Sequence, residues 1–296
     1  KTKLMRIGVT GASGMLGTSI ISELYKKYNI LATSRTKGFE AKNIKWDLFD
    51  LTNISHLKKW LTNSSPDLVI HCAAMVNIEE CEKNLEMARK LHIKSTKTIA
   101  SYLDLYNKKL IYISTDSVFD GNKKSPYIET DKVGPLNVYA QTKLLGEKYA
   151  LQSIDGLVLR TNIVGFSQSN SSSFADWILN GLRMGSPLNL FDDVLFSPLH
   201  VKTLTELINR AIDAELSGLF HCTSRDFISK YQFGIDMANI FNFSNANINK
   251  ISIDNMNFIA NRPKNMALSS TKLDSIIKFR LPLAKDAIRI MKSEHY

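Results

Sequence analysis

The chain has 296 residues, of which 44% are hydrophobic and 22% are charged, a composition typical of a globular protein long enough for about two domain units. No apolar run approaches the roughly 20 residues that a membrane-spanning helix needs, and the three cysteines show no metal-ligand spacing, so we expect a cytoplasmic protein with reduced thiols, no membrane contact and no metal. The net charge of +10 would suit nucleic-acid binding, but Lys and Arg form no run longer than a pair, so we expect a solvated basic surface and no nucleic-acid partner.

The first predicted unit is a strand, a glycine-rich turn and a helix, with the sequence TGASGMLG at residues 10–17. Gly11 would form a tight turn, Gly14 would let a pyrophosphate approach the main chain, and Gly17 would let the helix pack closely on the strand. The N-terminus of that helix would then face the phosphates. An ordinary glycine-rich turn can carry the same residues, so the rest of the chain has to decide between the two interpretations.

Basic residues follow the second predicted strand. A fold specific for NAD(H) carries Asp or Glu about 20 residues beyond the glycines, where the acid binds the ribose 2′-hydroxyl. This chain has Ser34, Arg35 and Lys37 there. Since Arg35 would attract a 2′-phosphate, the sequence favours NADP(H) over NAD(H), unless Arg35 is only a solvated surface base.

Strands and helices alternate through the first 164 residues. After the first strand, further strands are predicted at 29–33, 43–46, 68–71, 109–114 and 157–160, and helices at 15–27, 51–62, 79–107 and 137–151. Such alternation indicates parallel strands joined by right-handed crossovers. We therefore predict an α/β fold with a Rossmann-type doubly wound parallel sheet.

The alternation loosens beyond Gly165. Helices are predicted at 174–184, 201–215 and 230–241, with two short ones after 251, and short strands at 188–191, 194–196 and 219–222. A polar run at 168–173 is either a loop that orders over a ligand or a connector. We predict that residues 1–164, joined by 198–222, form an NADP-binding Rossmann domain, and that 165–197 and 223–296 form a smaller C-terminal α/β substrate-binding region.

Small residues and hydroxyls follow two of the predicted strands. Cys72, Ala73 and Ala74 would permit a flat ligand to approach closely, although they could also reflect tight packing. Ser114 and Thr115 end the next strand, at the edge where open α/β sheets bind their ligands.

Tyr139 and Lys143 are four residues apart in a predicted helix and therefore lie on one face. A free tyrosine has a pKa near 10, and a nearby ammonium group would lower that pKa toward neutrality. With a hydroxyl from Thr115 or Ser114 on the substrate oxygen, this combination predicts reduction of a carbonyl by a nicotinamide cofactor. Taken alone, the pair would also fit a half-buried tyrosine covered by a neighbouring lysine.

Together these motifs resemble those of the extended short-chain dehydrogenases/reductases, whose Thr-Gly-x-x-Gly-x-x-Gly turn matches residues 10–17 and whose Tyr-x-x-x-Lys pair matches Tyr139 and Lys143. Within that superfamily, STDSVFDG at 114–121 and NVYAQTKLLGE at 137–147 are most similar to the dTDP-4-dehydrorhamnose reductase group. Segments that begin at Ser197, Gly218 and Arg262 are similar to the C-terminal half of the same group.

The resemblance implies reduction, at C4, of a nucleotide-linked 4-keto-6-deoxy sugar in surface polysaccharide synthesis, by a protein that could form a homodimer. It implies that Thr115, Tyr139 and Lys143 are catalytic. The expected cofactor contacts are Gly11, Ser13, Gly14, Met15, Leu16, Gly17, Ser34, Arg35, Asp47, Leu48, Cys72, Ala73, Ala74, Ser114, Tyr139 and Lys143. The expected substrate contacts are Val76, Thr115, Asp116, Ser117, Ile163 and Arg262.

Three residues depart from the pattern of that group. Ser117 stands where Tyr is common and Ile163 where Trp is common, so the sugar can differ from the rhamnose precursor. His92 stands where extended members usually place an Asn that orients the lysine through a water. Either His92 substitutes for that Asn, or the active-site geometry differs, or His92 lies on a helix surface.

Two other functions remain open. A nucleotide-sugar epimerase of the same fold needs no distinctive residues, whereas dehydratases tend to place Asp-Glu directly after the catalytic Thr, and here Asp116 is followed by Ser117. The chain also resembles the regulatory subunit of methionine adenosyltransferase, which is non-catalytic, binds NADP and acts through a partner.

Overall fold

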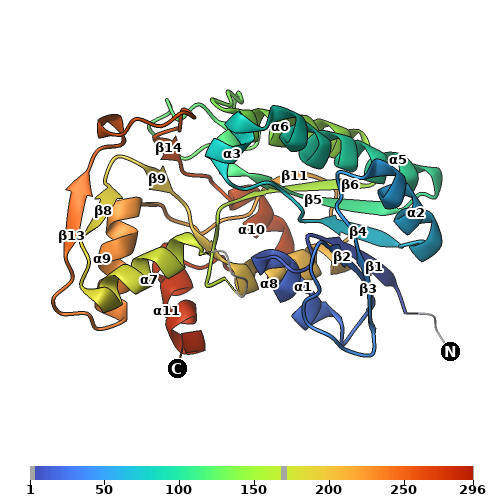
Figure 1. Ribbon diagram of the computed structural model, residues 1–296, viewed down its shortest axis with the longest axis horizontal. Coiled ribbons are helices and arrows are strands. Elements are labelled where there is room, and N and C mark those ends of the chain that lie inside the picture. Colours follow the sequence, from blue (N-terminus) through green and yellow to red (C-terminus); the bar gives the residue numbers. More distant parts are fainter. Residues whose placement is uncertain (1–3, 168–171, 296) are drawn as a thin grey trace.

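The computed structural model describes residues 4–167 and 172–295. Its centre is a sheet of seven strands in the order β11-β6-β5-β4-β1-β2-β3, and every neighbouring pair is parallel (Figure 1). The strands are β1 Arg6–Thr10, β2 Asn29–Ser34, β3 Ile44–Leu48, β4 Leu68–His71, β5 Lys109–Thr115, β6 Gly156–Thr161 and β11 Gly218–His221. The predicted doubly wound parallel sheet is confirmed.

Helices cover both faces of this sheet. Figure 1 shows α2, α5 and α6 on one face and α1, α8 and α10 on the other. Because both faces are covered, β5 is buried along its whole length, and its middle, residues 110–113, is a continuous apolar run. The bounds are α1 Met15–Leu24, α2 Ile54–Ser64, α5 Ser95–Leu105, α6 Val138–Gln152, α8 Val201–Asp213 and α10 Thr271–Ile277.

The single helix predicted for residues 79–107 is wrong. The segment consists of α3 Ile78–Lys83, α4 Leu85–Arg89, a π-helical turn η1 at Lys90–Lys94, and α5. Asn84 separates the first two helices, because its side chain accepts the Met87 N–H at 3.3 Å and so caps a new helix. The continuous apolar spacing hides both the cap and the π turn.

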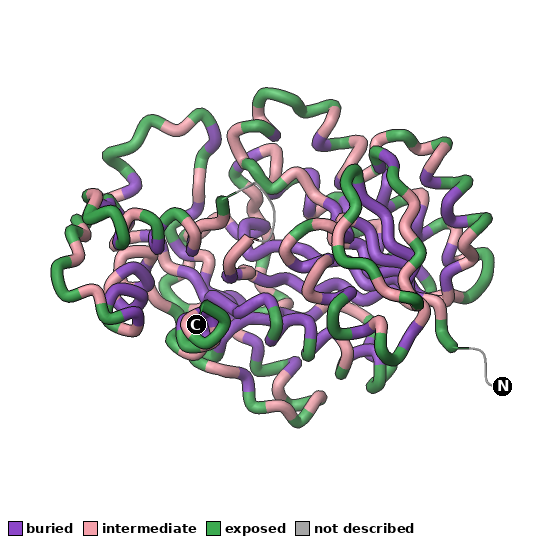
Figure 2. Tube along the Cα trace, turned by 60° about the horizontal axis from the view of Figure 1, so that its bottom comes forward, coloured by how far each residue is buried: buried purple, intermediate pink, exposed green. Residues whose placement is uncertain are grey.

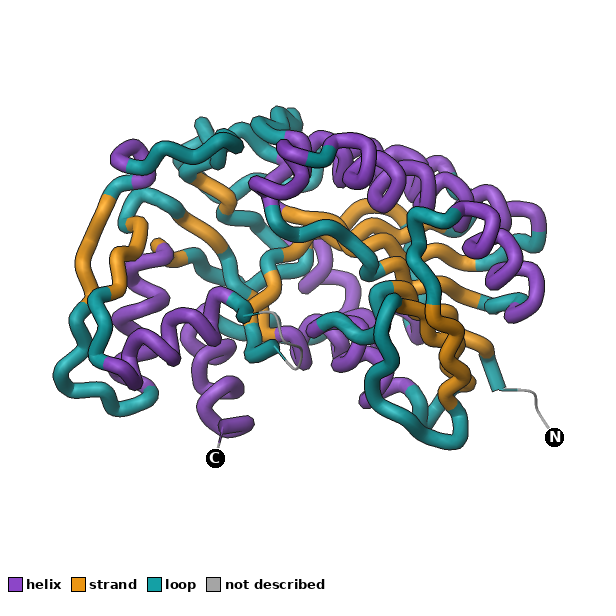
Figure 3. The backbone as a smooth tube through the Cα atoms, viewed as in Figure 1, coloured by secondary structure: helices purple, strands orange, loops and turns teal. Residues whose placement is uncertain are grey.

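A smaller layer lies beyond the carboxyl edge of the sheet (Figures 1 and 3). Its core contains Ile178, Phe196, Phe233 and Met237, all of them buried. The helices are α7 Phe174–Met184, α9 Lys230–Ile240 and α11 Ala284–His295; the strands are β7 Ile163–Val164, β8 Leu188–Phe191, β9 Leu195–Phe196, β10 Leu199–His200, β12 Ile228–Ser229, β13 Ile248–Ile251 and β14 Asn265–Met266; η2 Asp116–Val118 and η3 Ile253–Asn255 are short 3₁₀ turns.

Segments distant in sequence share the larger core. Figure 2 shows the buried residues concentrated in the interior and the exposed ones along the outer loops. Leu204 and Ile208 of α8 pack in the same cluster as Ile20 of α1, and β11 pairs with β6. Leu273 of α10 belongs to this cluster too, although the segment 223–296 was expected to lie with the substrate region. The domain boundaries stay a prediction. The prediction assigns α10 to the substrate-binding region, whereas in the structure α10 packs in the core of the seven-stranded sheet.

Within residues 4–167 and 172–295, no helix combines the length and apolar character needed to cross a bilayer. The same residues contain no group of three or more His, Cys, Asp or Glu side chains placed to hold a metal.

Candidate active site

A cleft of about 1240 Å³ opens at the carboxyl ends of β1, β2, β4, β5 and β6. The chain reverses its direction of strand addition between β1 and β4, so this is the crevice in which doubly wound sheets bind ligands. Ser173 and Phe174, at the start of α7, close its far side. The cleft exceeds the 300–1000 Å³ that is usual for one small ligand, so it has room for a cofactor and a substrate together.

The glycine turn forms one wall of the cleft. Gly11 has a φ of +64°, and a Cβ there would lie 2.8 Å from the main chain of Ala73, while a Cβ at Gly17 would meet the main chain of Gly11 and Ala12. Gly14 has only the Gly11 carbonyl oxygen nearby, at 3.2 Å. Packing of the chain itself thus requires Gly11 and Gly17, whereas Gly14 leaves space on the cleft side.

Gly14 also begins α1 without a side-chain cap. The first N–H groups of a helix have no partner inside the helix, and the helix dipole favours negative charge beside them. Because these N–H groups stand at the wall of the cleft, they form a ready site for a phosphate.

Ser34 and Arg35, at the end of β2, line the same end of the cleft as Ser13 and Thr36. The Thr36 hydroxyl donates to the Ser13 hydroxyl at 3.0 Å, which ties this segment to the glycine turn. Arg35 is exposed, so its guanidinium group is available to an anion.

Asp47 and Leu48 are not among the lining residues, in contrast to the expectation. They end β3, the edge strand of the sheet; Asp47 lies 3.6 Å from the imidazole of His56, and Leu48 is 47% exposed. The segment after the strand lines the cleft instead: Phe49, Asp50, Leu51 and Thr52.

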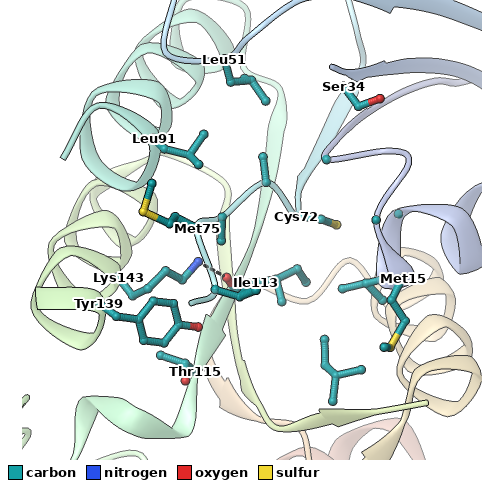
Figure 4. A pocket seen from close by; sticks show the side chains of 18 of the residues that line it. Met15, Ser34, Leu51, Cys72, Met75, Leu91, Ile113, Thr115, Tyr139 and Lys143 are labelled. Carbon is teal, nitrogen blue, oxygen red and sulfur yellow. Dashed lines mark hydrogen bonds between the residues drawn. The ribbon is translucent and has the colours of Figure 1, made fainter. Parts of the chain in front are cut away.

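Tyr139, Lys143 and Thr115 lie together on one side of the cleft (Figure 4). Asn137 accepts the Ala140 N–H at 2.9 Å and so begins α6, which carries Tyr139 and Lys143, while Thr115 ends the neighbouring β5. The Lys143 ammonium donates to the Ile113 carbonyl at 2.6 Å. The sequence prediction that these three residues meet agrees with this geometry.

The predicted effect of Lys143 on Tyr139 differs from what the structure shows. Burial lowers the pKa of Lys143 to about 7, although the carboxylate of Glu147 and the thiol of Cys72 oppose this shift. Burial raises the pKa of Tyr139, and the neighbouring Thr115 hydroxyl offsets only part of the rise. Since both groups are buried, desolvation exceeds the charge effect that the sequence analysis invoked.

An ion pair that the sequence analysis missed lies behind these residues. Arg160 of β6 donates to both carboxylate oxygens of Glu147 on α6, at 2.9 and 2.8 Å, and both side chains are at least 96% buried. Ser114 donates to the same carboxylate at 2.5 Å. The network therefore fixes α6 against β5 and β6. Glu147 and Arg160 are 13 positions apart, with no local pattern that could reveal the pair.

Asp116 lines the cleft beside Thr115. Its carboxylate accepts hydrogen bonds from Asn162 at 2.5 Å, Thr115 at 3.1 Å and Ser117 at 3.2 Å. Burial raises the pKa of Asp116, and Lys230 is one of the groups that oppose the rise.

Lys230 is a third residue that has no signature in the sequence. Its ammonium lies 3.3 Å from the ring centre of Phe196 and 4.7 Å from that of Phe174, which lines the cleft. Since Lys230 begins α9, far along the chain from Asp116, only the fold brings the two charges near one another.

Among the other expected contacts, Val76, Ser117 and Ile163 line the cleft and Arg262 does not. Arg262 donates to Glu79 at 3.1 Å and stacks on the ring of Phe258. Of the polar run at 168–173, Ser172 and Ser173 line the cleft, and 168–171 lie outside the described residues. The remaining expected contacts all line the cleft: Met15, Leu16, Cys72, Ala73, Ala74 and Ser114.

Known proteins resemble this chain along its whole length. The profile of the RmlD substrate binding domain family matches residues 5–295. The chain is 26% identical over 290 residues to a probable low-salt glycan biosynthesis reductase of Haloferax volcanii, with 96% of each chain covered. It is 28% identical over 290 residues to the beta subunit of methionine adenosyltransferase 2 of Rattus norvegicus, covering 92% of this chain and 82% of that one. The crystal structure of dTDP-4-dehydrorhamnose reductase from Bacillus anthracis in complex with NADP matches with a TM-score of 0.86 and 26% identity, over 99% of this chain and 100% of that one.

Proposed function

We propose that this chain, which belongs to the RmlD substrate binding domain family among the extended short-chain dehydrogenases/reductases, is an NADPH-dependent reductase of a nucleotide-linked 4-keto-6-deoxy sugar. One observation carries the proposal: Tyr139, Lys143 and Thr115 meet in one cleft with an uncapped helix N-terminus at Gly14. That combination joins a proton donor to a phosphate site.

The residues of the cleft fit a phosphorylated dinucleotide. The space at Gly14 and the first N–H groups of α1 suit a pyrophosphate, and the exposed Arg35 suits a 2′-phosphate. When bound, NADPH supplies the hydride for the reduction. The NADP complex of the Bacillus anthracis relative supports this cofactor.

In the proposed reaction the Tyr139 hydroxyl gives its proton to the C4 oxygen of the sugar. The pKa of Tyr139 is raised, so the group is protonated at neutral pH and ready to donate. Lys143, in its charged form, stabilises the phenolate that remains. Thr115 binds the same substrate oxygen, which requires its hydroxyl to turn away from Asp116, at 3.1 Å.

The sugar itself is identified only by class. Ser117 and Ile163 are small beside the aromatic residues common in the dTDP-4-dehydrorhamnose reductase group, so the site has room for a different substituent. Asp116 adds a carboxylate at this end of the cleft, which suits a sugar with free hydroxyl groups. The probable glycan biosynthesis reductase of Haloferax volcanii supports a role in glycan synthesis.

A second candidate is a non-catalytic NADP-binding subunit, favoured by the 28% identity with the beta subunit of methionine adenosyltransferase 2. It predicts cofactor binding without cofactor oxidation. A nucleotide-sugar epimerase would likewise show no net consumption of NADPH, but it would interconvert two sugars.

The test is NADPH oxidation followed at 340 nm with freshly prepared dTDP-, GDP- and UDP-linked 4-keto-6-deoxy sugars. We expect oxidation with at least one of them, and a product with a hydroxyl at C4. Binding of NADPH without oxidation by any sugar in the panel would reject the proposal and leave the binding subunit. Conversion of a sugar without NADPH loss would indicate the epimerase.

A further inference from the structure

His92 lies between two elements that line the cleft. It sits in the π turn η1 and is fully buried, so it does not lie on a helix surface. Its Nε2 atom accepts the main-chain N–H of Met75 at 2.9 Å. Met75 and Val76 line the cleft directly after Cys72, Ala73 and Ala74, so this bond holds the loop that leaves β4.

The tautomer of His92 follows from this bond. A main-chain N–H can be accepted only by a ring nitrogen without hydrogen, so the hydrogen is on Nδ1. That Nδ1–H donates to the Thr142 hydroxyl at 2.8 Å. Thr142 in turn donates to the carbonyl of Val138 at 2.7 Å or of Tyr139 at 3.0 Å. A directed series of hydrogen bonds thus runs from the cleft loop to the turn of α6 that carries Tyr139.

The helix α6 packs closely against η1 beside His92. A Cβ at Gly146 would lie 2.7 Å from the His92 carbonyl oxygen, so only glycine lets α6 come this near to η1. The Thr96 hydroxyl donates to that same carbonyl at 2.7 Å. The imidazole stands edge-on to the Tyr139 ring, with 5.8 Å between ring centres and 83° between planes. The imidazole and the Tyr139 ring therefore cannot shift independently.

His92 does not exchange protons in the working pH range. Burial, together with the charges of Lys143 and His71, lowers the pKa of His92 to about 2. The imidazole therefore stays neutral near neutral pH, with one acceptor and one donor. The Lys143 ammonium is held by the Ile113 carbonyl, whereas both ring nitrogens of His92 are engaged by Met75 and Thr142, so His92 acts through α6 and the cleft loop.

We propose that His92 is a positioning residue for the reduction, whose imidazole fixes the separation between the cleft loop at Met75 and the proton donor Tyr139 on α6. The inference rests on the proposed function, because it assigns His92 a part in that same reaction. A shift of about 1 Å in such a separation can lower a rate by about 100-fold.

Three variants separate the two bonds. His92→Leu removes both, His92→Asn can keep a donor near the place of Nδ1, and His92→Gln can keep an acceptor near the place of Nε2. The control is His221→Asn: His221 is also fully buried, donates through Nδ1 to the Tyr127 carbonyl at 3.1 Å, and does not line the cleft.

We expect His92→Leu to lower kcat by about 10- to 100-fold and to leave the NADPH Kd within about threefold of wild type. His92→Asn and His92→Gln each recover part of the rate, and His221→Asn lowers Tm without lowering kcat. The pH profile of His92→Leu keeps its shape at reduced height. Hydrogen exchange at the Met75 amide, which needs no turnover, becomes faster in His92→Leu and in His92→Asn but not in His221→Asn.

Three outcomes overturn the inference: wild-type kcat in folded His92→Leu, an equal loss of kcat in His221→Asn, or loss of one limb of the pH profile, which would make His92 a proton carrier. If wild-type protein oxidises no NADPH, the proposed reduction fails, and the exchange rate at Met75 still shows whether His92 holds the loop.

Discussion

Lys143 is a buried ammonium group that donates a hydrogen bond to the main-chain carbonyl of Ile113. Burial lowers the pKa of Lys143 to about 7, so a rise of pH through this value removes the charge that stabilises the tyrosinate in the proposed reaction. The rate should therefore fall on the basic side of pH 7. Glu147, one turn further along α6, is the group that most strongly opposes this loss of charge.

Glu147→Gln should move the basic limb of kcat/KM to lower pH by about one unit, because removing the carboxylate lowers the pKa of Lys143 further. It also leaves Arg160 unpaired in the interior, so we expect a loss of about 3–5 kcal/mol in the free energy of unfolding, measured in urea. Glu206→Gln, which breaks an exposed pair with Arg210, is the control and should change neither quantity appreciably. A basic limb that stays in place in Glu147→Gln would exclude Lys143 as its origin.

Arg35→Asp should weaken NADPH binding by about 10- to 100-fold and leave NADH binding little changed, because a carboxylate would repel a 2′-phosphate. Lys37→Asp is the matched control: Lys37 pairs with Glu40 at 2.8 Å and does not line the cleft. Dissociation constants measured by calorimetry for both cofactors test this. Equal losses for NADPH and NADH, or no loss at all, would contradict the assignment of Arg35 to the 2′-phosphate.

At the scale of elements, the close contact between α6 and η1 sets the place of Tyr139. Gly146→Ala puts a Cβ 2.7 Å from the His92 carbonyl oxygen and against the Tyr112 hydroxyl. Alanine favours a helix over glycine by about 1 kcal/mol, but overpacking costs about 1–3 kcal/mol, so we expect lower stability and lower kcat. Thermal unfolding and turnover measure both effects, with the exposed Lys148→Ala on the same helix as control. A more stable Gly146→Ala with full activity would show that α6 and η1 are free to separate.

Helices and strands that are long enough to carry a distinct apolar pattern can be predicted from the sequence, and shorter ones cannot. The strand β4 and the elements α7 and β8 begin and end at the predicted residues, because each is a distinct apolar pattern bounded by polar residues. Two-residue strands such as β7 and β10 were missed, since two residues carry no period. The π turn was missed because hydrophobic spacing does not distinguish it from the flanking helices.

Four histidines of the described residues are fully buried, namely His71, His92, His200 and His221, and burial lowers the pKa of each, so the stability of the whole molecule depends on pH. Burial lowers the pKa of His71 and His221 to about 3 and that of His92 to about 2. An unfolded histidine takes up a proton below about pH 6.5, whereas these folded ones remain neutral to far lower pH. The stabilisation is thus fully present above pH 6.5 and is lost progressively as the pH falls toward 3.

Each histidine should contribute a slope of up to about 1.4 kcal/mol per pH unit to the free energy of unfolding well below pH 6.5. Urea unfolding at pH 7.5, 6.0 and 5.0 should show a steep decline in the free energy of unfolding, and His221→Asn should lower the slope by up to about 1.4 kcal/mol per pH unit. A stability that is flat between pH 7.5 and 5.0 would show that these imidazoles are not neutral in the folded protein.

Some residues of the candidate site can be predicted from short sequence motifs, and others come together only through the fold. Gly11, Gly14, Tyr139 and Lys143 stand in short motifs, so the sequence alone is enough to assign them to the site. Glu147 with Arg160, and Asp116 with Lys230, join residues from different elements and have no local signature. Arg262 was expected at the substrate and pairs with Glu79, because α3 brings a carboxylate to it.

In the proposed reaction Tyr139 delivers the proton and NADPH the hydride. The most direct measurement is turnover of Tyr139→Phe with the best sugar of the panel, together with the NADPH Kd of the same preparation. We expect turnover to fall by about 100-fold or more while the Kd stays within about threefold, because the variant removes the hydroxyl and little else. Turnover of Tyr139→Phe equal to that of wild type would contradict the account.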